Sequence, residues 1–321
     1  MNQVSMPTDS SVIPKKKKKK YNYRKYSPLL IMMIPGFLYI LINNYLPMFG
    51  IVIAFKEINF AKGILQSDWI GLANFKYLFQ TSDAYIITRN TILYNVVFII
   101  AGTVLSFITA LMLIEIKNKF LLRTYQAIIS MPHLISWVIL SYLVYAFLSA
   151  ENGLLNRTIL PMLGIEGDIS WYTEAKYWPV ILTLVDFWKG VGYGSIVFFA
   201  ALLGINEEYY EAARIDGASR WKQITGITLP LVVPVIIVMT LLKLGRIFYS
   251  DFGLFYQVTL NSGALFETTA TIDTYVFNGL TGGGNMGMSA AAGFYQSIVG
   301  FILVITVNYL VRRKDKESAL F

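Results

Sequence analysis

The sequence contains no cysteine and a single histidine, His133, among its 321 residues. A disulfide framework, a thiolate metal site and a cysteine nucleophile are therefore excluded, and so is any site that needs several histidines. The pattern G-x-x-x-x-G-K-[ST], with which P-loop enzymes cradle nucleotide phosphates, is absent as well. We therefore expect that this chain is not an enzyme and binds neither a metal nor a cofactor of its own.

Charged residues are also scarce: they make up 14% of the chain, against 55% hydrophobic residues and a mean hydropathy of +0.55. A soluble domain of this length needs more polar surface, so the composition predicts that the lipid bilayer is its solvent. The net charge of +8 has the sign that nucleic acid attracts, but the basic residues are divided among segments between apolar runs. We therefore expect a membrane protein and no nucleic-acid partner.

Apolar runs recur along the chain, and six of them reach the ~20 residues that a membrane-spanning helix needs. They cover residues 28–54, 90–114, 126–148, 178–203, 229–250 and 289–311. The first run is too long for a cleaved signal peptide, and Pro35, Pro47 and Gly50 are expected to bend it. The sequence thus predicts an all-α polytopic protein with six transmembrane helices over residues 28–311, a basic tail before them and a short tail, 312–321, after them.

The distribution of lysine and arginine predicts the orientation of these helices. If the N-terminus is inside, eighteen basic residues fall in the inner segments and five in the outer ones. The inner segments are 1–27, 115–125, 204–228 and 312–321, and the outer segments are 55–88, 149–177 and 251–288. Because basic residues are enriched in cytoplasmic loops, we expect both termini in the cytoplasm. Lys15–Lys20 are then expected to contact anionic lipid, with RNA binding or nuclear localisation as the alternatives.

One polar interruption, residues 206–230, still has the pattern of ordered helix. Asn206 is expected to cap a short helix whose first turn is acidic, which suits the helix dipole. Gly217 fits the left-handed position after that helix, and Ser219 fits the cap of a second helix. The pattern predicts two short helices, joined by a tight turn and held between two spans.

The same segment resembles the EAA loop of the membrane subunits of bacterial ABC importers. Its marker residues are Glu211, Ala212, Ala213, Gly217, Ile227, Leu229 and Pro230. The resemblance implies that the loop is a cytoplasmic coupling helix that docks on a separate ATPase subunit. In that role Glu211 would form a charged hydrogen bond with the ATPase. The two alanines would allow close approach, and Gly217 would make the turn.

Other stretches resemble carbohydrate-import permeases of the LplB-like and MalF-like kind. They are Trp69–Phe79, Met131–Trp137, Asp186–Ser195, Ile272–Val276 and the tail Ser318–Phe321, although Phe321 stands where many relatives carry tryptophan. The resemblance spans residues 25–321 and implies a MetI-like permease fold in a bacterial plasma membrane. The implied partners are two ATPase subunits that use ATP and magnesium, a second permease subunit in a heterodimer, an extracellular substrate-binding lipoprotein and a carbohydrate, expected to be an oligosaccharide.

Ionisable side chains inside the predicted spans cost at least about 2.5 kcal/mol each at the bilayer centre, so they need partners or water. Four of them lie at similar depth in the outer half of spans four and five, and aromatic residues are close in sequence. They define a candidate substrate pathway of Asp186, Trp188, Lys189, Tyr193, Lys243, Arg246 and Tyr249. Inter-helix ion pairs are the alternative that the sequence leaves open. Three cations against one anion favour an acidic sugar, or an acidic residue of the partner permease.

An ion-coupled secondary transporter without an ATPase partner is the alternative function. Such a protein is expected to carry internal inverted repeats and coupling-ion carboxylates at mid-membrane. The sequence shows no such repeat, and Asp186 is its only acidic candidate. Residues Gly282–Gly287 match G-x-G-x-x-G, but they precede a predicted span instead of following a strand, so a dinucleotide site is not expected.

Overall fold

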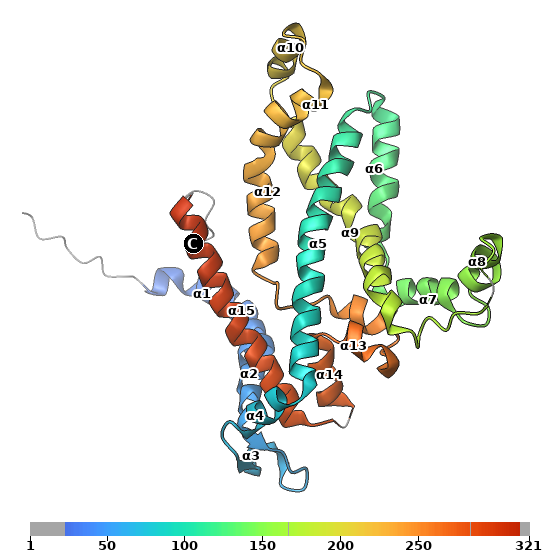
Figure 1. The fold of residues 1–321 in the computed structure, drawn as a ribbon. Coiled ribbons are helices and arrows are strands. Elements are labelled where there is room, and N and C mark those ends of the chain that lie inside the picture. Colours follow the sequence, from blue (N-terminus) through green and yellow to red (C-terminus); the bar gives the residue numbers. More distant parts are fainter. Residues whose placement is uncertain (1–22, 166, 283, 315–321) are drawn as a thin grey trace, which may run out of the picture. The chain divides into compact units, whose positions relative to one another are not determined.

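The computed structural model describes residues 23–165, 167–282 and 284–314, and the chain divides into two compact units, residues 1–50 and 51–321 (Figure 1). The described residues are almost entirely helical, and their one sheet pairs two strands of two residues each. Five helices are long and apolar enough to cross a membrane, or six if a bent pair counts as one span. The predicted all-α polytopic architecture is therefore confirmed.

The described part of the first unit, from Tyr23 on, is helical throughout. Helix α1 (Tyr23–Ile40) continues through the π-helical turn η1 (Leu41–Tyr45) into α2 (Leu46–Met48). These elements belong to an apolar stretch of 30 residues, Tyr26–Phe55. The predictions made for Lys15–Lys20 and for the tail Ser318–Phe321 concern residues outside the described part of the chain.

The second unit begins within the 3₁₀ helix η2 (Phe49–Phe55). Its first small elements are β1 (Lys56–Glu57), α3 (Gly63–Gln66), β2 (Asp68–Trp69) and α4 (Ala73–Gln80). The two strands are antiparallel, with Lys56 opposite Trp69. The larger helices are α5 (Ser82–Ile114), α6 (Lys119–Leu134), α7 (Trp137–Leu148), α9 (Trp178–Leu203), α12 (Leu229–Leu244) and α15 (Met286–Lys314). The connecting elements are η3 (Leu155–Ile159), α8 (Leu160–Met162), η4 (Ala175–Tyr177), α10 (Glu208–Ile215), α11 (Arg220–Gln223), η5 (Ile224–Thr228), η6 (Gly253–Val258), η7 (Gly263–Leu265), α13 (Phe266–Thr269) and α14 (Ile272–Thr281).

The long helices of this unit alternate in direction. Helices α5, α9 and α15 run toward the end that carries α10, and α6 and α12 run back from it (Figure 1). We refer to this end as the α10 end and to the opposite one, where α13 and α14 lie, as the α14 end. Segments 115–118 and 204–219 thus share one end, as the alternation of the predicted spans requires.

The third predicted span, 126–148, is not one straight helix. Helix α6 ends at Leu134, α7 starts at Trp137, and the two helices are bent by 95° at this break. Ser136 has an extended backbone, and its Oγ accepts a hydrogen bond from the backbone N–H of Ile139 at 3.3 Å. This capped restart allows α7 to leave the direction of α6. A hydropathy window reports apolar length only, so it predicts one span here.

Three π-helical turns each end two residues before a proline. Turn η1 precedes Pro47, η3 precedes Pro161 and η5 precedes Pro230. Proline has no N–H, and its ring crowds the carbonyl oxygen four residues back, so it disturbs a regular α-helical turn. The wider π turn accommodates the proline without ending the helix. A π turn thus stands before Pro47, one of the positions where the sequence predicts a bend, whereas Pro35 lies within α1. Helix α12 continues directly from the loop that contains α10.

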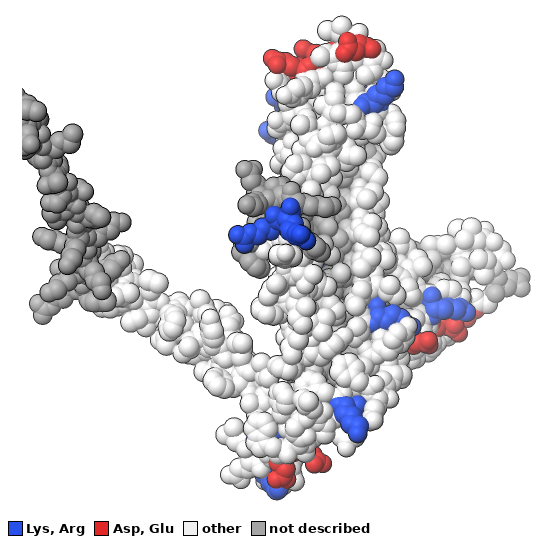
Figure 2. All heavy atoms as spheres, turned by 60° about the vertical axis from the view of Figure 1, so that its left-hand side comes forward, with Lys and Arg blue, Asp and Glu red and all other residues white. Residues whose placement is uncertain are grey.

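Charged side chains are distributed unevenly over the second unit. On the face in Figure 2, acidic and basic groups lie at the α10 end and at the opposite end; between these ends the surface is mostly uncharged, apart from a basic patch beside the grey residues. In the four candidate spans of this unit, between 17% and 39% of the most apolar window is buried. Most of the apolar surface of these helices thus faces outward, as in a protein surrounded by lipid.

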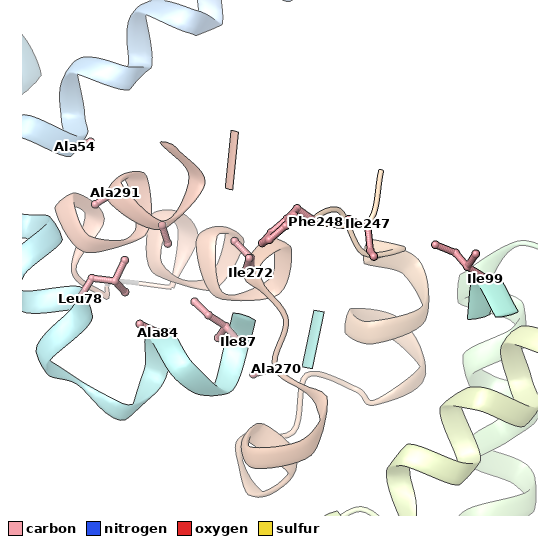
Figure 3. Close-up of a cluster of buried hydrophobic side chains, with 11 residues drawn as sticks. Ala54, Leu78, Ala84, Ile87, Ile99, Ile247, Phe248, Ala270, Ile272 and Ala291 are labelled. Atoms are coloured by element: carbon pink, nitrogen blue, oxygen red, sulfur yellow. The ribbon is translucent and has the colours of Figure 1, made fainter. Parts of the chain in front are cut away.

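Three clusters of buried apolar residues hold the second unit together. At the α14 end, Phe248 after α12 packs with Ile272 of α14 and Ala291 of α15 (Figure 3). A second cluster surrounds Trp178 at the start of α9. The third surrounds Phe198 and joins α5, α9 and α12. These contacts fix the three helices that form the walls of the site described next.

Candidate functional site

A cavity of about 450 Å³ lies between α5, α9 and α12. It contains five of the seven residues proposed from the sequence as a substrate pathway. These are Asp186 and Tyr193 of α9, Lys243 of α12, and Arg246 and Tyr249 of the segment that follows α12. Residues from two predicted spans therefore meet at one cavity.

The charged groups of this cavity are not paired with one another. The described residues form four ion pairs within 4.0 Å, and none of them includes Asp186, Lys243 or Arg246. The inter-helix ion pairs that the sequence left open are thus not formed in this part of the chain. Among the same residues, no group of three or more His, Cys, Asp or Glu side chains could hold a metal ion.

The other two candidate residues, Trp188 and Lys189, do not line this cavity. The Lys189 side chain is buried and points to the end of α6, where its Nζ donates hydrogen bonds to the carbonyl oxygens of Pro132 (3.3 Å), His133 (3.0 Å) and Ile135. The same ammonium group lies 4.9 Å from the ring centroid of Trp137, the first residue of α7. Lys189 therefore connects α9 to the corner between α6 and α7.

A glycine in α9 allows this helix, which forms one wall of the cavity, to pack closely against α6. A Cβ atom at Gly192 would lie 1.8 Å from the carbonyl oxygen of Ile129, so α9 approaches the backbone of α6 too closely for any side chain. One residue on, the ring of Tyr193 stacks on His133 of α6, with ring centroids 4.2 Å apart and an interplanar angle of 4°. The glycine contact thus places Tyr193 between α6 and the cavity.

The loop with the EAA pattern has the local structure that the sequence predicts. Ser219 Oγ accepts a hydrogen bond from the N–H of Lys222 (3.4 Å), as a cap of α11. At α10 the N-cap position is Glu207 and not the expected Asn206, although Asn206 Oδ1 accepts a hydrogen bond from the N–H of Glu208 (3.1 Å). Gly217 has a φ of +74°, and the next N–H, of Ala218, donates to Ala213 O at 2.8 Å. The left-handed glycine and this bond close the C-terminus of α10.

The seven marker residues of this loop differ in exposure. Glu211, Ala212, Gly217, Leu229 and Pro230 are exposed, and Ala213 and Ile227 are half-buried. Tyr209, Ile215 and Trp221 add exposed apolar surface of 57%, 87% and 72%. The α10 end therefore offers a mixed acidic and apolar surface around the marker residues.

Side-chain contacts that sequence patterns did not indicate attach this loop to two spans. The hydroxyl of Tyr210 in α10 lies 2.8 Å from Thr228 Oγ1, at the last residue before α12. Arg220 of α11 pairs with Glu115 at the end of α5, with 3.1 Å between Nη1 and Oε1. A tyrosine and a threonine 18 positions apart carry no periodic signal, so only the folded loop identifies this pair.

A polytopic helical chain with a charged cavity between its spans and a structured polar loop at one end belongs to the class of membrane permeases. Residues 102–316 match the family described as the inner membrane component of binding-protein-dependent transport systems. This chain belongs to that family. It is therefore a transport subunit and not an enzyme, and the permease fold predicted from the sequence is confirmed.

Individual relatives agree with this assignment over nearly the whole chain. Protein LplB of Bacillus subtilis (strain 168) is 35% identical over 292 residues, which are 90% of each chain. The polygalacturonan/rhamnogalacturonan transport system permease protein YteP of the same organism is 31% identical over 98% of each chain. A chain of a bacterial ABC transporter involved in the import of the acidic polysaccharide alginate is 32% identical, with a TM-score of 0.80 over 91% of this chain and 97% of that one.

Proposed function

We propose that this chain is the permease subunit of a binding-protein-dependent ABC importer for an oligosaccharide, in which it forms one half of the translocation pore. The observation that carries the proposal is the continuity of α12, which begins in the EAA loop at the α10 end and lines the cavity with Lys243. If the loop moves, α12 moves with it, and so does the cavity wall that α12 forms. The saccharides named for YteP and for the alginate importer support the type of cargo.

The proposed orientation places the α10 end in the cytoplasm, against an ATPase subunit, in a complex with two of them. Segments 115–125 and 204–228 carry six basic residues in 36 positions, whereas the outer segments 55–88, 149–177 and 251–288 carry five in 101 positions. This bias supports a cytoplasmic α10 end and cytoplasmic termini. A second permease subunit would complete the pore, and a substrate-binding lipoprotein would dock at the α14 end. A solved alginate transporter, in complex with its alginate-bound periplasmic protein, supports this arrangement.

In the proposed mechanism, closure of the ATPase subunits on ATP moves α10 as a rigid body. The bond between Tyr210 and Thr228 and the ion pair between Arg220 and Glu115 pass this movement to α12 and α5. Both helices line the cavity, so their displacement opens it alternately to the two sides of the membrane. The pore subunit itself needs no nucleotide site for this work.

Reconstitution tests the proposal directly. The chain is co-expressed with a second permease and an ATPase, placed in proteoliposomes with the binding protein, and assayed for uptake of labelled oligosaccharides. We expect the ATPase to copurify, and uptake to require ATP and to cease with a non-hydrolysable analogue. Uptake that follows an ion gradient without nucleotide would identify a secondary transporter instead.

The bond between α10 and α12 leads to a first prediction. Tyr210→Phe removes one hydroxyl and is expected to lower the number of sugars transported per ATP hydrolysed, with a small loss of stability of about 1 kcal/mol. Thr228→Val removes the other partner, so the double variant should be no worse than the more affected single variant. The measurement is uptake and ATP hydrolysis in the same vesicles.

The matched control for this pair is Tyr125→Phe, which removes the hydroxyl of a tyrosine that is 47% exposed on α6. It should leave the transport ratio at the wild-type value. Strictly additive losses in the Tyr210→Phe, Thr228→Val double variant would show that the two side chains do not act as a unit.

A further inference from the structure

The cavity between α5, α9 and α12 has an excess of positive charge. Its charged lining residues are Asp186, Lys243 and Arg246, which leaves two cations against one anion. Lys189, the third cation expected here, is held by the carbonyl oxygens at the end of α6 and contributes nothing to this balance. The residues that line the cavity thus include one more cation than anions, and within 4.0 Å neither the arginine nor the lysine has a carboxylate partner in the described structure.

The local backbone stabilises only part of the positive charge in this cavity. Lys243 lies in the last turn of α12, where the helix dipole stabilises a cation. That effect is small for one side chain, and it does not extend to Arg246, which follows the helix. Two cations this far within the predicted spans are costly unless water or a ligand compensates them. An anionic ligand would compensate them directly.

We propose that this cavity selects saccharides that carry carboxylate groups, such as uronic acid residues. Arg246 presents a planar fork that fits a carboxylate, and Lys243 supplies a second positive charge beside it. Asp186 accepts hydrogen bonds from sugar hydroxyls, and the rings of Tyr193 and Tyr249 offer apolar faces to the sugar rings. The inference rests on the proposed function and specifies its substrate class.

A single carboxylate matches the net charge of the cavity better than a more highly charged group does. With Asp186 in the same cavity, a dianionic phosphate or several sulfates would meet repulsion as well as attraction. The opposing carboxylate also keeps binding weak enough for release, which a transport pathway requires. Asp186 is thus expected to lower the affinity for an acidic sugar and to help its passage.

The experiment compares two probes that differ mainly in charge: a trisaccharide with one galacturonate residue and its methyl ester, delivered by the binding protein to the reconstituted complex. In the Lys243→Gln, Arg246→Gln double variant we expect uptake of the acidic trisaccharide to fall about tenfold or more, and uptake of the ester to change less than about twofold. Asp186→Asn should lower the half-saturating concentration of the acid and leave that of the ester unchanged.

Two further variants keep the test decisive if the double variant is poorly folded. Lys243→Arg, Arg246→Lys keeps both charges and should retain acid uptake. Lys62→Gln removes a surface lysine that pairs with Asp68 at 2.8 Å outside the cavity, and should change neither probe's uptake. Loss of copurification with the second permease in the charge-free variant alone would assign Lys243 and Arg246 to a partner carboxylate, and would overturn the inference.

The failure of this inference is distinguishable from that of the proposed function. ATP-dependent uptake of a neutral oligosaccharide, with equal losses for acid and ester in the double variant, overturns the acidic cargo and keeps the importer. The same conclusion follows if the wild-type complex transports neutral sugars but neither galacturonate probe. Absence of ATP-dependent uptake for every saccharide tested overturns both.

Discussion

Replacement of Gly217 by valine is expected to abolish sugar uptake while the ATPase of the complex continues to hydrolyse ATP. Gly217 has a φ of +74°, a conformation that costs a residue with a side chain about 1–2 kcal/mol, and most for a β-branched one. No atom lies within 4 Å of the position that its Cβ would occupy, so the effect comes from the backbone and not from a clash. The turn would relax by moving α10, and Glu211 with it, away from the ATPase.

Two other substitutions separate this effect from general instability. Gly217→Asn should retain most of the uptake, because asparagine tolerates the left-handed conformation. Gly164→Val introduces the same strain elsewhere, since Gly164 has a φ of +73° and equally open surroundings. The measurement is the ratio of sugar transported to ATP hydrolysed in proteoliposomes. A wild-type ratio in Gly217→Val, or an equal loss in Gly164→Val, would remove Gly217 from the coupling mechanism.

The turn at Gly217 could be predicted because its determinants are local. Asn206, Gly217 and Ser219 each act on N–H groups or dihedral angles within a few residues, so their roles follow from spacing alone. The bond between Tyr210 and Thr228 depends on how α10 folds back against the start of α12. No local rule indicates such a contact, and the sequence provides no signal for it.

For the helices too, the sequence predicts what depends on local residues and does not predict what depends on packing in the folded chain. Apolar length predicts six spans, and the first, fourth and sixth correspond closely to helical stretches of the structure. The second begins at Ser82, earlier than its apolar core, because a helix extends beyond the residues that lie in lipid. The third is bent by 95° because the chain restarts at Ser136, and the fifth ends at Leu244 before a turn.

The sequence predicts which two spans contribute charged residues to the cavity, but it does not predict which of those side chains line it. The rise per residue of a helix is fixed, so Asp186 and Lys243 could be placed at one level from their distance to the span ends. The direction of each side chain depends on the neighbour that it meets. Three residues beyond Asp186, Lys189 meets the open end of α6 instead of the cavity. Helix periodicity cannot distinguish these two outcomes.

Replacement of Lys189 by methionine is expected to destabilise the whole subunit. Methionine fills a similar volume but donates no hydrogen bond, so carbonyl oxygens at the partly buried end of α6 lose the Lys189 donor. Each unsatisfied group costs about 1–3 kcal/mol, and the contact with the Trp137 ring is lost too. We expect the melting temperature of the purified complex to fall by ~5 °C or more, with a lower yield.

Lys176→Met is the matched control, because it removes a lysine that is 66% exposed and pairs with Glu174 in a connecting segment of the same unit. It should leave the melting temperature nearly unchanged, since exposed ion pairs contribute little. The two roles open to Lys189 then give opposite results. If Lys189 stabilises the corner between α6 and α7, the Lys189→Met variant is less stable, and its folded fraction still transports sugar. If Lys189 instead contacts the substrate, its replacement abolishes uptake. The melting temperature then stays at the wild-type value, because the corner between α6 and α7 would be stable without the ammonium group.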